Sequence, residues 1–66
     1  MEIGKIYKVL GENDFHPELQ PEGTVVQCVG ENSSGYFIVE LVDNCGKKID
    51  VEKWIVKDDK DKFILI

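Results

Sequence analysis

The chain has 66 residues, of which 42% are hydrophobic and 32% charged, so it has room for one hydrophobic core and for no deep cleft between domains. All eight basic residues are lysine, thirteen residues are acidic, and the formal net charge at pH 7 is −5. Affinity for nucleic acid comes mostly from neutralising phosphates, so this charge makes nucleic-acid binding an unfavoured class.

The first two segments are predicted to be a strand and a long loop. Ile3 to Leu10 alternates imperfectly with a period of two, which favours a strand. Gly11 to Glu22 contains both prolines and four acidic residues but no lysine. Because proline removes backbone donors, we expect a loop here rather than a helix, anchored on the body by Phe15 and Leu19.

The clearest signal is a β-hairpin. Two runs rich in β-branched and aromatic residues, Thr24 to Val29 and Tyr36 to Val42, flank the polar segment Gly30 to Gly35. The polar side chains of Gln27 and Glu40 mark the outer faces of the two strands. The residues predicted to face the core are therefore Val26, Cys28, Phe37, Val39 and Leu41.

Asp43 to Gly46 is a typical turn sequence, with Asp, Asn and a closing glycine. The next segment, Lys47 to Val51, alternates so that Ile49 and Val51 are predicted to face inward. We therefore expect Ile49 to join Val26 and Val39 in the core.

The remaining residues complete the predicted domain. Glu52 to Val56 is expected to include a short helical turn, Lys57 to Lys62 is a charged turn, and Phe63 to Ile66 is a short terminal strand. We expect one domain over residues 1–66. No apolar stretch is long enough to cross a bilayer and the N-terminal residues do not resemble a signal peptide, so we expect a cytoplasmic protein without a membrane segment.

This order of elements resembles an SH3-like small barrel. Glu18 to Val26 is similar to the diverging turn of that fold, and Gly35 to Val39 is similar to the aromatic segment that follows its n-Src loop. Asp43 to Gly46 corresponds to the distal turn and Gly11 to Glu22 to the RT loop. The aromatic motif that opens the SH3 peptide groove is absent from Ile3 to Leu10. The resemblance therefore implies a fold, an all-β SH3-like barrel of five to six short strands with a long acidic loop.

The residues with catalytic or metal-binding chemistry are few. His16, Cys28 and Cys45 match no zinc-ligand spacing and form no evident nucleophile–base pair. The two thiols are expected to be reduced, with Cys28 in the core. We therefore expect no enzymatic activity, no cofactor and no metal site.

The acidic loop and the aromatic residues suggest a binding surface. Residues 11–31 carry five acidic side chains and no lysine, which indicates either a solvated face or a surface for a basic partner. In an SH3-like barrel the aromatic side chains would lie beside this loop, although Trp54 could equally belong to the core. The predicted partner-binding residues are Asp14, Phe15, Glu18, Tyr36 and Trp54.

The leading functional hypothesis is a non-enzymatic protein–protein interaction module that binds a protein or peptide of basic character. Lysine without arginine is typical of AT-rich coding, so a bacterial or phage protein that binds a host factor fits this hypothesis. Two alternatives stay open: nucleic-acid binding through a stripe of Lys47, Lys48, Lys53 and Lys57, and an acidic mimic of nucleic acid. The sequence leaves the oligomeric state open.

Overall fold

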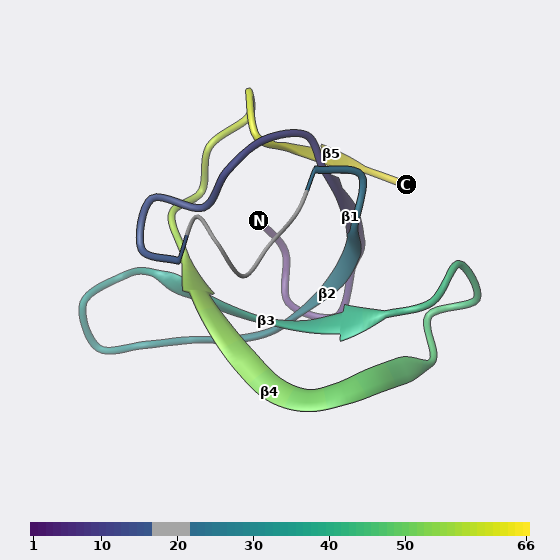
Figure 1. The fold of residues 1–66 in the computed structure, drawn as a ribbon. Helices are drawn as coiled ribbons and strands as arrows, with labels where there is room; N and C mark the ends of the chain where they lie inside the picture. The colour runs from purple at the N-terminus through teal and green to yellow at the C-terminus, as the bar shows by residue number, and fades with distance from the viewer. Residues whose placement is uncertain (17–21) are drawn as a thin grey trace.

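The computed structural model describes residues 1–16 and 22–66, and the regular elements in this part of the chain are all strands. They are β1 (Ile6–Val9), β2 (Val25–Glu31), β3 (Phe37–Val42), β4 (Lys48–Val56) and β5 (Phe63–Leu65). Together they form one antiparallel sheet in the order β4-β3-β2-β1-β5 (Figure 1). The predicted all-β class is therefore confirmed.

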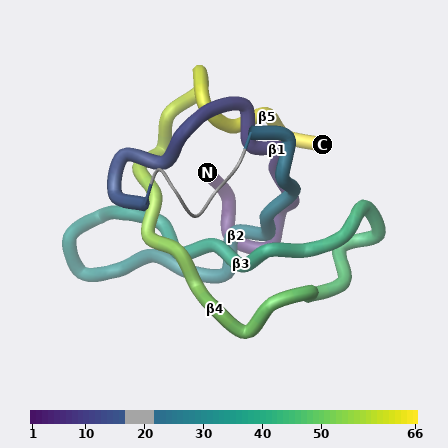
Figure 2. The backbone as a smooth tube through the Cα atoms, viewed as in Figure 1, coloured from purple at the N-terminus to yellow at the C-terminus, as the bar shows by residue number. Residues whose placement is uncertain are grey.

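The sheet is strongly curved, as the backbone trace shows (Figure 2). Strands β1 to β4 follow one another as a meander, and β5 returns to pair with the free side of β1. Within the described residues no hydrogen-bonded ladder joins β4 to β5. These two strands are therefore the edges of an open sheet.

The predicted hairpin is formed by β2 and β3, with Val26 opposite Leu41 and Cys28 opposite Val39. β2 continues further than predicted, through a bulge between Cys28 and Gly30. The loop that follows is held by the Asn32 side chain, whose Oδ1 accepts hydrogen bonds from two backbone N–H groups of the loop, each at 3.0 Å. This local bonding replaces the ladder that the loop cannot make.

The predicted turn at Asp43 to Gly46 is present. Asp43 Oδ1 accepts hydrogen bonds from the N–H groups of Cys45 and Lys47, both at 2.9 Å. Gly46 has a φ of 85°, a left-handed conformation that side chains disfavour. A Cβ atom at Gly46 would lie 2.8 Å from Ile6 Cδ1, so the turn folds back against β1.

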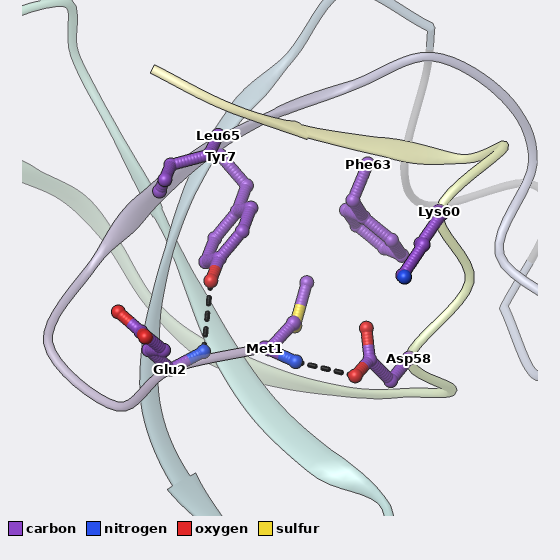
Figure 3. A pocket seen from close by; sticks show the side chains of 7 residues that line it. All are labelled: Met1, Glu2, Tyr7, Asp58, Lys60, Phe63 and Leu65. Atoms are coloured by element: carbon purple, nitrogen blue, oxygen red, sulfur yellow. Dashed lines mark hydrogen bonds and ion pairs between the residues drawn. The ribbon is translucent and has the colours of Figure 1, made fainter.

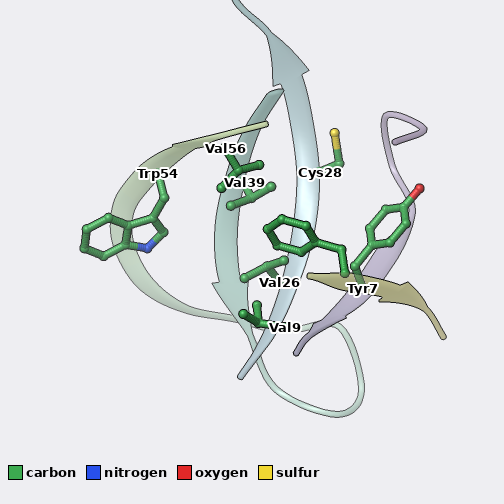
Figure 4. Close-up of a cluster of buried hydrophobic side chains, with 8 residues drawn as sticks. Tyr7, Val9, Val26, Cys28, Val39, Trp54 and Val56 are labelled. Carbon is green, nitrogen blue, oxygen red and sulfur yellow. The ribbon is translucent and has the colours of Figure 1, made fainter. Parts of the chain in front are cut away.

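The core lies on the concave side of the curved sheet (Figure 4). Its cluster of buried residues comprises Tyr7, Val9, Val26, Cys28, Val39, Trp54, Val56 and Phe63, and Phe37 and Leu41 pack against it. The predicted inward faces of both hairpin strands are therefore confirmed. Val42 is also buried, although alternation placed it on the outer face.

The prediction for the first half of β4 is wrong. Ile49 is 62% exposed and Val51 is 83% exposed. The pairing with β3 passes from Glu40↔Lys53 directly to Val42↔Lys48, so residues 49–52 leave the ladder. The alternation that points Trp54 and Val56 inward therefore does not extend across this shift, and Ile49 and Val51 lie on the side that faces solvent.

The helical turn predicted within Glu52 to Val56 is also wrong, because this segment continues β4 and pairs with β3. Glu40 faces this strand and is nearly buried. Its carboxylate forms an ion pair with Lys48, with 2.7 Å between Oε2 and Nζ. That contact explains how an acidic side chain tolerates a central strand.

The end of the described chain agrees with the sequence analysis. The backbone N–H groups of Lys62 and Phe63 both donate to the Asp59 carbonyl, at 3.1 and 3.2 Å, and close the charged turn. β5 then places Phe63 opposite Val9. No helix in the described residues has the length and apolar character needed to cross a membrane.

Candidate functional site

The long β1–β2 loop is attached to the outer edge of β4 by one buried amide. Asn13 Nδ2 donates to the Ile55 carbonyl at 3.0 Å, and Asn13 Oδ1 accepts from the Phe15 N–H at 2.9 Å. Asn13 is only 3% exposed, so both groups are bonded within the protein rather than to water. The amide therefore fixes the position of Phe15 relative to β4.

Phe15 packs against an aromatic residue from a different loop. Its ring lies edge-to-face with Tyr36, the residue before β3, with 5.0 Å between the ring centroids and an interplanar angle of 62°. Such pairs contribute about 0.5–1.5 kcal/mol beyond their buried area. Phe15 nevertheless remains 41% exposed, so the pair presents an apolar surface to solvent.

Trp54 lies beneath the loop rather than on the surface. It is 6% exposed and belongs to the core cluster. Trp54 is therefore a core residue and not an exposed binding residue. Its ring meets His16 edge-to-face at 5.7 Å between centroids. The buried indole Nε1 has no hydrogen-bond acceptor among the described residues.

The charged residues of the site form an ion-pair cluster. Lys62 Nζ lies 2.5 Å from Asp14 Oδ1, and Lys57 Nζ lies 3.9 Å from Asp14 Oδ2. The hydrogen bond from Lys62 holds the pKa of the Asp14 carboxyl below its ordinary value, and the charges of both lysines lower it further. Lys57 Nζ also lies over the Phe15 ring, 5.7 Å from its centroid.

Three of the predicted partner-binding residues come together: Asp14, Phe15 and Tyr36 form one surface, which we call the loop site. Trp54 supports this surface from below through His16. Glu18 lies outside the described residues, as does the predicted anchor Leu19.

Sequence reasoning missed four residues that build the loop site: Asn13, His16, Lys57 and Lys62. Asparagine in a loop tends to bond a backbone N–H two residues further on, and this tendency could have identified Asn13. The two lysines carry no such signal, because they are separated from Asp14 by 43 and 48 positions in the sequence.

Other candidate sites in the described residues are weaker. Cys28 is buried, Cys45 is exposed and neither forms a disulfide; three or more metal-ligating side chains gather nowhere in the described part of the chain. Lys48 and Lys57, two members of the predicted lysine stripe, contact carboxylates. These contacts reduce the positive charge that the stripe offers to a phosphate backbone.

A depression beside β1 and β5 is lined by Met1, Glu2, Tyr7, Asp58, Lys60, Phe63 and Leu65 (Figure 3). Two pairs of polar groups along it are bonded to one another. The Glu2 N–H donates to the Tyr7 hydroxyl oxygen at 2.8 Å, and the Met1 amine contacts the Asp58 carboxylate at 2.5 Å. These contacts occupy part of the polar surface that could orient a ligand.

The chain matches no protein-family model, no curated protein and no solved structure. We therefore infer its role from the geometry of the loop site.

Proposed function

We propose that this protein is a non-enzymatic interaction module with an SH3-like barrel fold, and that its loop site binds a protein or peptide of basic character. The strand order β4-β3-β2-β1-β5 and the long loop between β1 and β2 support the fold. The two open edge strands depart from a fully closed barrel. A solution structure with contacts between the ends of β4 and β5 would test this part of the proposal.

One observation carries the proposed binding function: an aromatic pair, partly exposed through Phe15, that already holds a lysine. Phe15 and Tyr36 expose an apolar surface, and the Lys57 ammonium lies over the Phe15 ring while it contacts Asp14. Aromatic faces and carboxylates are the groups that attract lysine and arginine side chains. The internal lysine therefore occupies the position that a cation of the partner would take.

The consequence is that Lys57 competes with the partner. Its side chain is about half exposed, so it can move into water without leaving a buried charge behind. The Lys62 contact to the other Asp14 oxygen is shorter and holds the carboxylate in place. A basic partner would thus exchange with Lys57 and keep the Asp14–Lys62 pair.

The test is to pan a displayed library of random peptides on the protein and to measure the affinity of an enriched peptide by calorimetry. We expect enrichment of sequences with Lys or Arg. Phe15→Ala should weaken binding about tenfold or more, as truncation of an aromatic hot spot does. Lys57→Gln should strengthen binding by about two- to fivefold, because it removes a competing exposed cation–π contact of about 0.5–1 kcal/mol.

The matched control is Ile64→Ala, which truncates an exposed apolar residue on β5. This variant should bind as the wild type does. Enriched peptides without basic residues would overturn the proposed partner chemistry. Weaker binding by Lys57→Gln would show that Lys57 contacts the partner directly, and the partner would then carry acidic groups.

A further inference from the structure

The two edges of the sheet differ in length and in how they are covered. β5 has three residues, a length at which an edge strand offers little backbone for pairing, whereas β4 has nine. The C-terminal half of β4 is covered where the Ile55 carbonyl accepts the hydrogen bond from Asn13. The other half, which begins at Lys48, has no comparable cover from the described residues.

This uncovered half also carries the most exposed apolar side chains of the two edges. Ile49 is 62% exposed and Val51 is 83% exposed, and they alternate with charged residues. The segment stays extended although it has left the ladder with β3, and Asp50 Oδ1 bonds the Glu52 N–H at 3.0 Å. A shallow hollow is lined by Lys48, Ile49, Asp50 and Val51. An extended edge with exposed β-branched residues favours pairing with another strand.

We propose that Lys47 to Val51 pairs with the same segment of a second copy of this chain, as antiparallel strands related by a two-fold axis. The segment is complementary to itself when Ile49 lies opposite Ile49 of the second copy. In this register Lys48 lies opposite Asp50 at both ends, and opposite charges meet on one face of the pair: the half-exposed Lys48 would be shared between Glu40, its ion-pair partner at 2.7 Å, and Asp50 of the second copy. On the other face the two Ile49 side chains meet at the centre, and each Val51 lies opposite the aliphatic stem of Lys47.

The charge pattern favours a second copy over an unrelated strand, because symmetry satisfies both ion pairs at once. A contact between two short segments falls below the roughly 1,200 Å² of a stable interface, so the dimer should be weak and dependent on concentration. The contact uses the half of β4 that is remote from Trp54 and Ile55. Self-association therefore does not require the loop site and is independent of the proposed function.

The test compares two lysine substitutions at sites of equal exposure. Sedimentation velocity and amide NMR spectra would be recorded between about 0.05 and 2 mM protein, a range that covers weak association. We expect the wild type to dimerise over this range, with shift changes at residues 47–52. Ile49→Lys should abolish the concentration dependence. Ile3→Lys should preserve it, because Ile3 is 61% exposed but lies in another segment.

A charge exchange tests the register. Asp50→Lys and Lys48→Asp should each lose association alone, because like charges then face each other. An equimolar mixture should recover it, since each Lys of one variant then meets an Asp of the other. Circular dichroism would first establish that both variants fold, because Lys48 also contacts Glu40.

A wild type that stays monomeric at about 2 mM would overturn the proposal, because a dimer with a dissociation constant of roughly 1 mM or below would be well populated at that concentration. Shift changes on β5 in place of residues 47–52 would overturn it as well. Equal effects of Ile49→Lys and Ile3→Lys would do the same, and these outcomes do not depend on the folding of the charge variants.

Discussion

At the scale of single residues, Asp14 differs most from what its sequence context suggested. The predicted loop contains no lysine of its own, but Asp14 contacts two lysines from the segment that connects β4 to β5. Glu12 and Glu22 on the same loop are exposed. In the proposed function, these glutamates would supply the negative charge that steers a basic partner at long range, whereas Asp14 would act at contact distance.

The two cysteines should differ in reactivity. Burial raises the pKa of the Cys28 thiol above its usual value of 9.0, and its side chain is fully buried, whereas Cys45 is exposed in a turn. Alkylation of Cys28 then requires unfolding, and a free energy of unfolding of about 3 kcal/mol or more keeps the open fraction below about 1%. We expect iodoacetamide to label Cys45 at least about 100-fold faster, as measured by mass spectrometry of peptides.

The control for this experiment is the denatured chain, in which both thiols should react at similar rates. Comparable rates in the native protein would show that β2 opens locally without global unfolding.

At the scale of elements, the sequence predicted the strands better than their faces. β2 and β3 follow clear runs of β-branched residues, and the alternation in each placed Val26, Cys28 and Val39 correctly. The prediction for β4 divided one strand into two elements, which allowed Ile49 to be assigned inward although Trp54, in the same strand, also faces inward. A regular strand points one parity toward the core, and the ladder shift opposite β3, which breaks this alternation, has no signature in the sequence.

The loop site could be predicted only in part from the sequence. Phe15 and Tyr36 are aromatic residues in two loops that the predicted SH3-like order of elements would bring together. Lys57 and Lys62 reach the site only through the return of the chain towards β5, which local sequence does not specify. Their positions follow from the fold and not from spacing.

The turn between β3 and β4 provides a prediction at this scale. Gly46 and Gly35 have nearly equal φ angles, 85° and 84°, but only a Cβ at Gly46 would meet another residue, at 2.8 Å from Ile6 Cδ1. Alanine in this conformation costs about 1–2 kcal/mol of stability at either site. Gly46→Ala should cost roughly 0.5–1.5 kcal/mol more, because the Ile6 side chain must leave its rotamer. Urea unfolding would measure both variants.

Ile6→Val supplies the control, since it removes the Cδ1 atom. In that background Gly46→Ala and Gly35→Ala should destabilise the domain equally. A persistent difference would mean that the turn itself, and not its contact with β1, is strained at Gly46.

At the scale of the whole molecule, the Asp14–Lys62 pair joins the loop after β1 to the turn before β5. The Lys62 hydrogen bond lowers the pKa of Asp14 below 3.8, and the same bond raises the pKa of Lys62 above 10.5. A carboxyl group whose pKa is lowered by folding stabilises the fold at pH values above its pKa in the unfolded state. This contribution is lost as pH falls through the pKa of the folded state. A lysine whose pKa is raised by folding stabilises the fold at pH values below its pKa in the unfolded state. This contribution is lost as pH rises through the pKa of the folded state.

Lys62→Met should therefore reduce stability at neutral pH, and the difference from wild type should shrink as the solution is acidified below 3.8. NMR titration of the Asp14 carboxyl carbon should show a higher pKa in this variant. Lys60→Met, on the same turn, should leave the Asp14 pKa unchanged. A pKa that Lys62→Met does not move would show that Lys62 and Asp14 do not interact in solution.

The position of β1 between β2 and β5 has a consequence for the order of folding. The meander from β2 to β4 pairs neighbours in sequence, whereas the β1–β5 ladder joins Tyr7 to Leu65 and must close a loop of nearly the whole chain. Loop closure of that length is slow compared with hairpin formation, so β5 should dock last. Lys62 directly precedes β5 and reaches Asp14 only when β5 docks. A partly folded chain would therefore have the Phe15–Tyr36 pair without the Asp14–Lys62 ion pair beside it. If the loop site binds a partner as proposed, the rate at which it becomes competent to bind is then set by the docking of the last strand.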